Sequence, residues 1–132
     1  MFDYFLMFIF TFIIFFVIDI LWLSTFAKKT YDKYLGYLLA DKVIWPAAMI
    51  FYVLFIIGLV YFAIAPGVEA NSIGKVILNG ALFGFFTYAT YDLTNLATVK
   101  DWPLKITIID LIWGTSVGMV SATLGYLLFT LI

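Results

Sequence analysis

Four long apolar stretches limit what this chain can fold into. They cover residues 3–25, 43–64, 73–98 and 104–131, and a bilayer core about 30 Å thick needs roughly 20 apolar residues per helix. The chain is 66% hydrophobic and 11% charged, and a soluble domain of 132 residues could not bury its four Trp, nine Tyr and fifteen Phe. The sequence therefore predicts an all-α integral membrane protein with four transmembrane helices in a single domain.

The residue types that are missing narrow the chemistry. The chain has no cysteine and no histidine, so disulfides, thiolate metal sites and histidine acid–base catalysis are excluded. Any site must use carboxylates, amides, hydroxyls, lysines or aromatic rings. The formal charge of −1 indicates no nucleic-acid partner. The first apolar stretch is too long for a cleaved signal peptide and follows Asp3 instead of a basic cluster, so we expect it to be retained.

The lysines predict the orientation in the membrane. The middle connection has a single lysine, Lys75, beside Glu69, whereas the first and last connections hold the others. Because positive loops stay in the cytoplasm, both termini are expected outside. The lysines of the first and last connections are Lys28, Lys29, Lys33, Lys42, Lys100 and Lys105.

The first connection predicts a short interfacial helix at about residues 28–41. Its apolar residues recur at helical spacing, with charged residues on the opposite side. The apolar positions are Tyr31, Tyr34, Leu35, Leu38 and Leu39. Such a helix either anchors the connection in the headgroup layer or acts as a mobile lid over a site.

Two pairs of segments suggest an internal repeat. The segment DILWLSTF from Asp19 aligns with DLTNLATV from Asp92, and a Trp-Pro pair opens both the second and fourth stretches, at residues 45–46 and 102–103. Duplication would make the fold two repeated helical hairpins. The alternative is coincidence, because proline favours the first helical turn and tryptophan favours the membrane interface.

Three aspartates lie inside the apolar stretches at a similar predicted depth. Asp19, Asp92 and Asp110 each lie about six residues from the lysine-bearing end, hence about 9 Å deep at ~1.5 Å per residue. An aspartate at the centre of a membrane helix costs roughly 2.5–3.5 kcal/mol on insertion scales. We therefore expect a polar cavity in which the three carboxyls share a proton, a cation or a cationic group. The alternative is that each aspartate only hydrogen-bonds a neighbouring helix.

Other residues can be assigned around these carboxyls. Aromatic and amide side chains would form the walls of an ion or solute site, although Trp22, Trp45 and Trp102 also fit an interfacial aromatic belt. The predicted wall residues are Tyr88, Tyr91, Asn95, Trp22, Trp45 and Trp113. A bound metal would use Asp19, Asp92, Asn95 and Asp110. Close helix packing is predicted at Gly84, Gly114, Gly118, Ser121 and Gly125.

The segments YDLTNLATVKDWP and IDLIWG carry a resemblance to a known family. The chain resembles a group of small four-span bacterial membrane proteins, the domain-of-unknown-function family numbered 2177, over nearly its whole length. The resemblance implies a bacterial inner-membrane location but no activity, and it assigns no role to any residue.

Three functions are consistent with these features. The first is a small transporter or channel-like protein for a cation or small solute that uses the three aspartates. The second is a Mg²⁺-dependent enzyme acting on a lipid or isoprenoid headgroup, with Lys42, Lys100 and Lys105 near its phosphate. The third is a structural or assembly subunit surrounded by membrane lipid. Such a small bundle is expected to form a homo-oligomer, and a dimer is the expected state. The interface would be the glycine-rich face of the fourth stretch or the surface of the third.

Overall fold

The computed structural model describes residues 2–132, and these residues form only helices, turns and loops. The prediction of an all-α protein is confirmed. The helical segments are α1 (Phe2–Ser24), α2 (Phe26–Leu35), α3 (Trp45–Leu59), the π-helix η1 (Val60–Ile64), α4 (Ala65–Ala70), α5 (Ile73–Thr98) and α6 (Leu104–Leu131). Segments α3, η1 and α4 join without a break into one helix, Trp45–Ala70.

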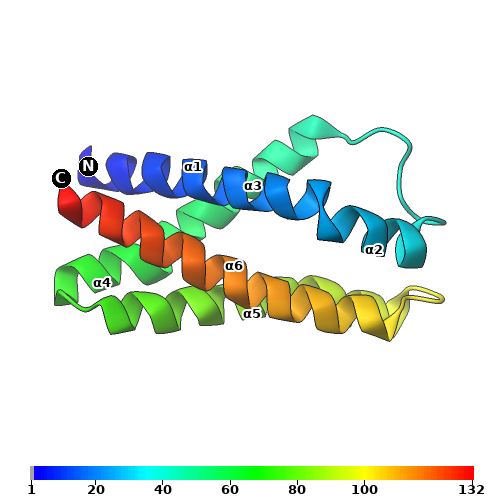
Figure 1. The fold of residues 1–132 in the computed structure, drawn as a ribbon. Coiled ribbons are helices and arrows are strands. Elements are labelled where there is room, and N and C mark those ends of the chain that lie inside the picture. The colour runs from blue at the N-terminus through cyan, green and yellow to red at the C-terminus, as the bar shows by residue number, and fades with distance from the viewer. Residues whose placement is uncertain (1) are drawn as a thin grey trace.

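The long helices run back and forth along one axis, so the molecule has two ends (Figure 1). Both termini and α4 lie at one end, whereas α2 and the turn between α5 and α6 lie at the other. Helices α5 and α6 pack side by side, while α3 crosses the bundle and its first turn stands apart. Ile44 and Trp45 at that first turn are more than half exposed.

Three helices are long and apolar enough to cross a membrane: α1, Trp45–Ala70 and α6. Helix α5 has 26 residues, which is enough length, but polar side chains such as Asn79, Asp92 and Asn95 make it less apolar. The transmembrane character of the chain is thus supported for three helices. A fourth crossing by α5 and the repeat of two hairpins stay predictions.

Glycines bring α5 and α6 into backbone contact. A Cβ atom added to Gly84 would lie 2.0 Å from the carbonyl oxygen of Gly114, and one added to Gly118 would lie 2.5 Å from that of Gly80. Gly125 makes room for Thr11 of α1 in the same way, at 2.1 Å from its Oγ1. The glycine-rich face of α6 is therefore covered within the chain and is not free to form a dimer.

The second apolar helix runs past its predicted end at residue 64. Pro66 and Gly67 come after that predicted end but lie inside the helix, which ends where Asn71 adopts a left-handed conformation with φ 51°. Pro66 has no N–H to offer the carbonyl of Phe62, four residues earlier. The Asn79 side chain on α5 donates to that carbonyl at 3.1 Å, so the helix continues without an unpaired group there.

Helix α2 ends at Leu35, six residues before the predicted end. Gly36 follows it, and Leu38 and Leu39 lie outside the helix with nearly half of their surface exposed. Glycine has a low helix propensity, which accounts for the early end. Leu35 packs instead on Trp102 and Ile106, so Trp102 is buried under α2 and does not belong to an interfacial belt.

Candidate functional site

The closest pair of acidic side chains is formed by Asp92 of α5 and Asp110 of α6. Asp92 is fully buried and Asp110 is 8% exposed. Their carboxyls are neighbours within hydrogen-bonding reach of each other. The glycine contact between Gly84 and Gly114, two turns away on α5, brings the two helices close enough for this pairing.

Asp92 has no conventional hydrogen-bond donor. Neither of its carboxyl oxygens accepts a bond from any N–H or O–H group in residues 2–132. A proton held between Asp92 and Asp110 would satisfy it, because a carboxylic acid donates and a carboxylate accepts. Two buried carboxyls side by side therefore need a shared proton or a cation.

Asp110 is also bound by the short helix α2. The Tyr31 hydroxyl donates to Asp110 Oδ1, across 79 positions of sequence. Burial, and after it the bond to Asp110, raises the pKa of the Tyr31 phenol above its usual range, so Tyr31 is a hydrogen-bond donor at any physiological pH. Helix α2 is held in this position by the apolar contact of Leu35 and by Tyr37, whose hydroxyl donates to the Asp101 carbonyl at 2.6 Å.

Asp19 occupies a separate place on α1. Its Oδ2 accepts a hydrogen bond from the Tyr52 hydroxyl of α3, and the Trp113 indole of α6 lies within hydrogen-bonding reach of the same carboxyl. Trp113 stacks on Trp22 of α1, with ring centroids 4.2 Å apart and planes within 5°. Asp19 is thus paired with Tyr52 and Trp113 and not with Asp92 or Asp110.

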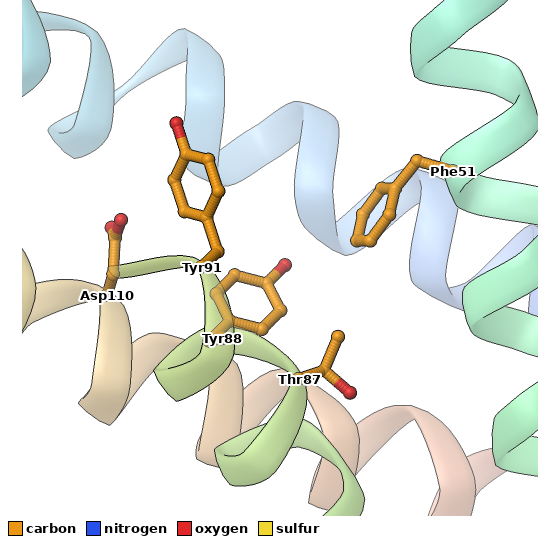
Figure 2. A pocket seen from close by; sticks show the side chains of 5 residues that line it. All are labelled: Phe51, Thr87, Tyr88, Tyr91 and Asp110. Atoms are coloured by element: carbon orange, nitrogen blue, oxygen red, sulfur yellow. The ribbon is translucent and has the colours of Figure 1, made fainter. Parts of the chain in front are cut away.

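A cavity of about 420 Å³ opens beside the Asp92–Asp110 pair. Figure 2 shows the side chains of Asp110, Tyr91 and Tyr88 projecting into one space, with Phe51 of α3 on its far side. Thr87 completes the lining, and the wall is almost entirely apolar. Since Phe51 and Tyr91 are 40% and 59% exposed, the cavity opens on the outer surface of the bundle between α3 and α5.

The structure brings together only part of the predicted site. Asp110, Tyr88 and Tyr91 line the cavity, and Asn95 lies within hydrogen-bonding reach of Tyr91. The three aspartates do not form one cluster within residues 2–132: Asp110 lines the cavity, whereas Asp19 is paired with Tyr52 of α3. Tyr88 is near enough to both Asp19 and Asp110 to interact electrostatically with each.

Two further predicted groupings are not formed. Trp45 is 52% exposed on the first turn of α3, where the helix stands apart from the bundle, so it does not form a wall of the cavity (Figure 1). Within residues 2–132, no three acidic side chains gather closely enough to hold a metal ion. The predicted metal set of Asp19, Asp92, Asn95 and Asp110 is thus divided between two places.

Several important residues were not predicted as part of the site. Tyr31 and Tyr52 bond the aspartates, and Phe51 and Thr87 line the cavity. Gly80 packs on Gly118, and its Gly80-x-x-x-Gly84 spacing was a visible signal for close helix packing. No local pattern could reveal the two tyrosines, because each reaches an aspartate on a different helix.

These observations define a class: an all-helical membrane protein with a buried carboxyl pair beside a lateral apolar cavity. The chain belongs to the family described as "Predicted membrane protein (DUF2177)", whose pattern it matches over residues 4–127. The membership agrees with the resemblance seen in the sequence and supports a membrane location. No curated protein and no solved structure matches the chain significantly.

Proposed function

We propose that this protein is a small membrane transporter for an organic cation with an apolar body, and that it exchanges the cation for a proton at Asp92 and Asp110. One observation carries the proposal. An apolar cavity open to the side of the bundle has one acidic residue in its lining, Asp110, and that residue is paired with a buried carboxyl that lacks any other donor.

The cavity suits a small organic cation better than a bare metal ion. Its volume of about 420 Å³ falls within the range of small-molecule sites, roughly 300–1,000 Å³. The rings of Phe51, Tyr88 and Tyr91 offer aromatic faces to a positive charge. A hydrated inorganic ion would gain nothing from these apolar walls.

Proton exchange follows from the carboxyl pair. When the cavity is empty, a proton between Asp92 and Asp110 satisfies both acids, and Tyr31 donates a further bond to Asp110. A cation entering the cavity supplies the positive charge, so the shared proton is released. Reprotonation then expels the cation, because the charge that held it is neutralised.

We propose further that α5 forms the fourth membrane crossing, since it lies beside α6 and has the length to do so. The end that bears α2 and the turn between α5 and α6 faces the cytoplasm of a bacterial inner membrane, and both termini lie outside. The two Trp-Pro pairs are relics of a duplicated hairpin. The chain acts as a dimer that uses the outer surface of α5.

The Mg²⁺-dependent enzyme and the structural subunit are the competing functions. The enzyme hypothesis requires a cluster of acidic ligands for Mg²⁺, and residues 2–132 contain no such cluster. A purely structural role explains the Tyr52–Asp19 bond, but it gives no reason for a second buried acid without a donor. The transporter accounts for both the pair and the cavity.

The test is proton release on cation binding. Purified protein in weakly buffered detergent is titrated with aryl-substituted quaternary ammonium ions of increasing size, beginning with benzyltrimethylammonium. We expect about one proton released per cation bound, and loss of both binding and release in Asp110→Asn and Asp92→Asn. The matched control is Asp32→Asn, an exposed acid of α2. Binding without proton release, or unchanged release in both variants, would contradict the proposal.

The same variants are then compared in vesicles with a proton gradient. Uptake of the cation should depend on the gradient in the native protein and in Asp32→Asn. If cation binding is absent in the native protein while Asp92→Asn and Asp110→Asn unfold, the structural role is the better explanation.

A further inference from the structure

A second site lies outside the cavity, on the surface between α2 and the beginning of α6. A shallow hollow of about 250 Å³ is lined by three lysines, Lys29 and Lys33 of α2 and Lys105 of α6. No acidic residue lines it, although Asp32 is adjacent to Lys33 in the sequence. Three lysines thus line one hollow without an acidic residue in its walls.

The position of Tyr34 shows how the lysines converge. The Lys33 ammonium lies 5.3 Å from the centroid of the Tyr34 ring and the Lys105 ammonium lies 5.4 Å from it. Hydrogen bonding to Lys105, and to a smaller extent the charge of Lys33, lowers the pKa of the Tyr34 phenol. Two ammonium groups from different helices therefore lie near the same ring.

The lining of the hollow is partly polar and partly apolar. Thr30 adds a hydroxyl beside the lysines, whereas Phe26 and Ile109 add apolar surface. Lys105 lies on the first turn of α6 and Ile109 lies one turn deeper into that candidate membrane helix. A lipid beside this surface would have its phosphate at the level of Lys105 and the first carbons of its acyl chains at the level of Ile109.

We propose that this hollow binds the headgroup of an anionic phospholipid, with Lys29, Lys33 and Lys105 around the phosphate and Phe26 and Ile109 against the first carbons of the acyl chains. Basic pockets at the end of membrane helices are suited to acidic headgroups. The apolar lining by Phe26 and Ile109 favours a lipid over free phosphate. A bound headgroup joins α2 to α6, one helical turn from the Tyr31–Asp110 bond.

The proposal predicts lipid retention that depends on these three lysines. The purified chain in nonionic detergent is titrated with phosphatidylglycerol or phosphatidylcholine, and bound lipid is counted by native mass spectrometry while the melting temperature is followed. Phosphatidylglycerol should be retained and should raise the melting temperature, and phosphatidylcholine should do neither. The variant Lys29→Gln/Lys33→Gln/Lys105→Gln should weaken phosphatidylglycerol binding by at least about tenfold.

The control has the same loss of charge elsewhere on the chain: Lys28→Gln/Lys42→Gln/Lys75→Gln. It should bind phosphatidylglycerol like the native protein. If the control weakens binding equally, or phosphatidylcholine is retained equally well, the site is not there. A third titration uses inorganic phosphate alone, and stabilisation equal to that by the lipid would overturn the lipid assignment. The single variant Lys105→Gln repeats the measurement with the least change to the fold.

Discussion

The three buried aspartates differ in the groups that hydrogen-bond them. Asp19 receives the Tyr52 hydroxyl, Asp110 receives the Tyr31 hydroxyl, and Asp92 has only its neighbour Asp110. A hydrogen bond to a charged group contributes about 1.5–3 kcal/mol, which is close to the cost of placing one aspartate in a membrane helix. Asp19 and its tyrosine donor are thus explained by packing alone, whereas Asp92, which has no such donor, is not.

The pairing of Asp19 can be tested by removing its donor. Tyr52→Phe leaves a buried carboxyl without its phenol donor, so we expect the free energy of unfolding in detergent to fall by about 1–3 kcal/mol. Tyr61→Phe is the matched control, because Tyr61 is 67% exposed in the same continuous helix. Cation binding should survive in Tyr52→Phe, and its loss there would mean that Asp19 belongs to the binding site.

The phenol of Tyr31 predicts a loss of stability in alkali. Its pKa in the folded protein is raised, so its contribution is fully present below the ordinary tyrosine pKa of about 10 and is lost as pH rises beyond that value. The loss of stability above about pH 10 should therefore be smaller in Tyr31→Phe than in the native protein. Tyr4→Phe, on the exposed first turn of α1, should retain the native alkaline profile. Superimposable profiles for Tyr31→Phe and the native protein would mean that Tyr31 is not held in its buried position.

At the scale of helices, the contact of α5 with α6 positions the carboxyl pair. Gly84→Ala would place a methyl group 2.0 Å from the Gly114 carbonyl oxygen, and two backbones must separate to admit it. We expect a loss of about 1–3 kcal/mol in the free energy of unfolding, together with weaker cation binding. Gly74→Ala on the same helix is the control, since its nearest neighbour would be Ser72 Oγ at 3.8 Å. Equal stability of both alanine variants would show that α5 and α6 are farther apart than the structure has them.

The helices could be predicted from the sequence where the cause is local. Apolar length gave the ranges of α5 and α6, and Ser72, which accepts a bond from the Lys75 amide, marks the beginning of α5. The end of the second apolar helix could not be predicted in this way. Proline normally ends a helix, and it is tolerated here because Asn79, on another helix, bonds the carbonyl that Pro66 leaves free.

The same limit applies to the site. Depth counting placed the three aspartates near one level, but depth does not fix the direction in which each side chain points. The crossing of α3 brings Tyr52 to Asp19, and the bend after Ser24 brings Tyr31 to Asp110 (Figure 1). Both contacts depend on how helices cross, and no periodicity within one segment encodes that.

The two proposed sites are distributed unevenly between the two ends of the molecule. The end that bears α2 has the lysine hollow, the Tyr31–Asp110 bond and the nearby cavity, whereas the end with the termini has none of these. A lipid in the lysine hollow would contact α2 directly, and a cation in the cavity would affect α2 through the Tyr31–Asp110 bond. In the proposed transporter, a cation would enter from the bilayer through the lateral opening between α3 and α5.

This arrangement requires that α5 cross the membrane, and the chain is well suited to a direct test because it has no cysteine. Single cysteines at Ser72, before α5, and at Lys100, after it, are labelled in intact cells with a membrane-impermeant maleimide. If α5 is a span, Ser72→Cys reacts from outside and Lys100→Cys reacts only after the membrane is permeabilised. Asp3→Cys near the N-terminus should behave like Ser72→Cys, because Figure 1 places both termini and the end of α4 together. Equal labelling of Ser72→Cys and Lys100→Cys in intact cells would place both ends of α5 on one side. Asp92 would then not lie on a membrane-spanning helix, and its burial would carry no membrane cost for a proton or a cation to relieve.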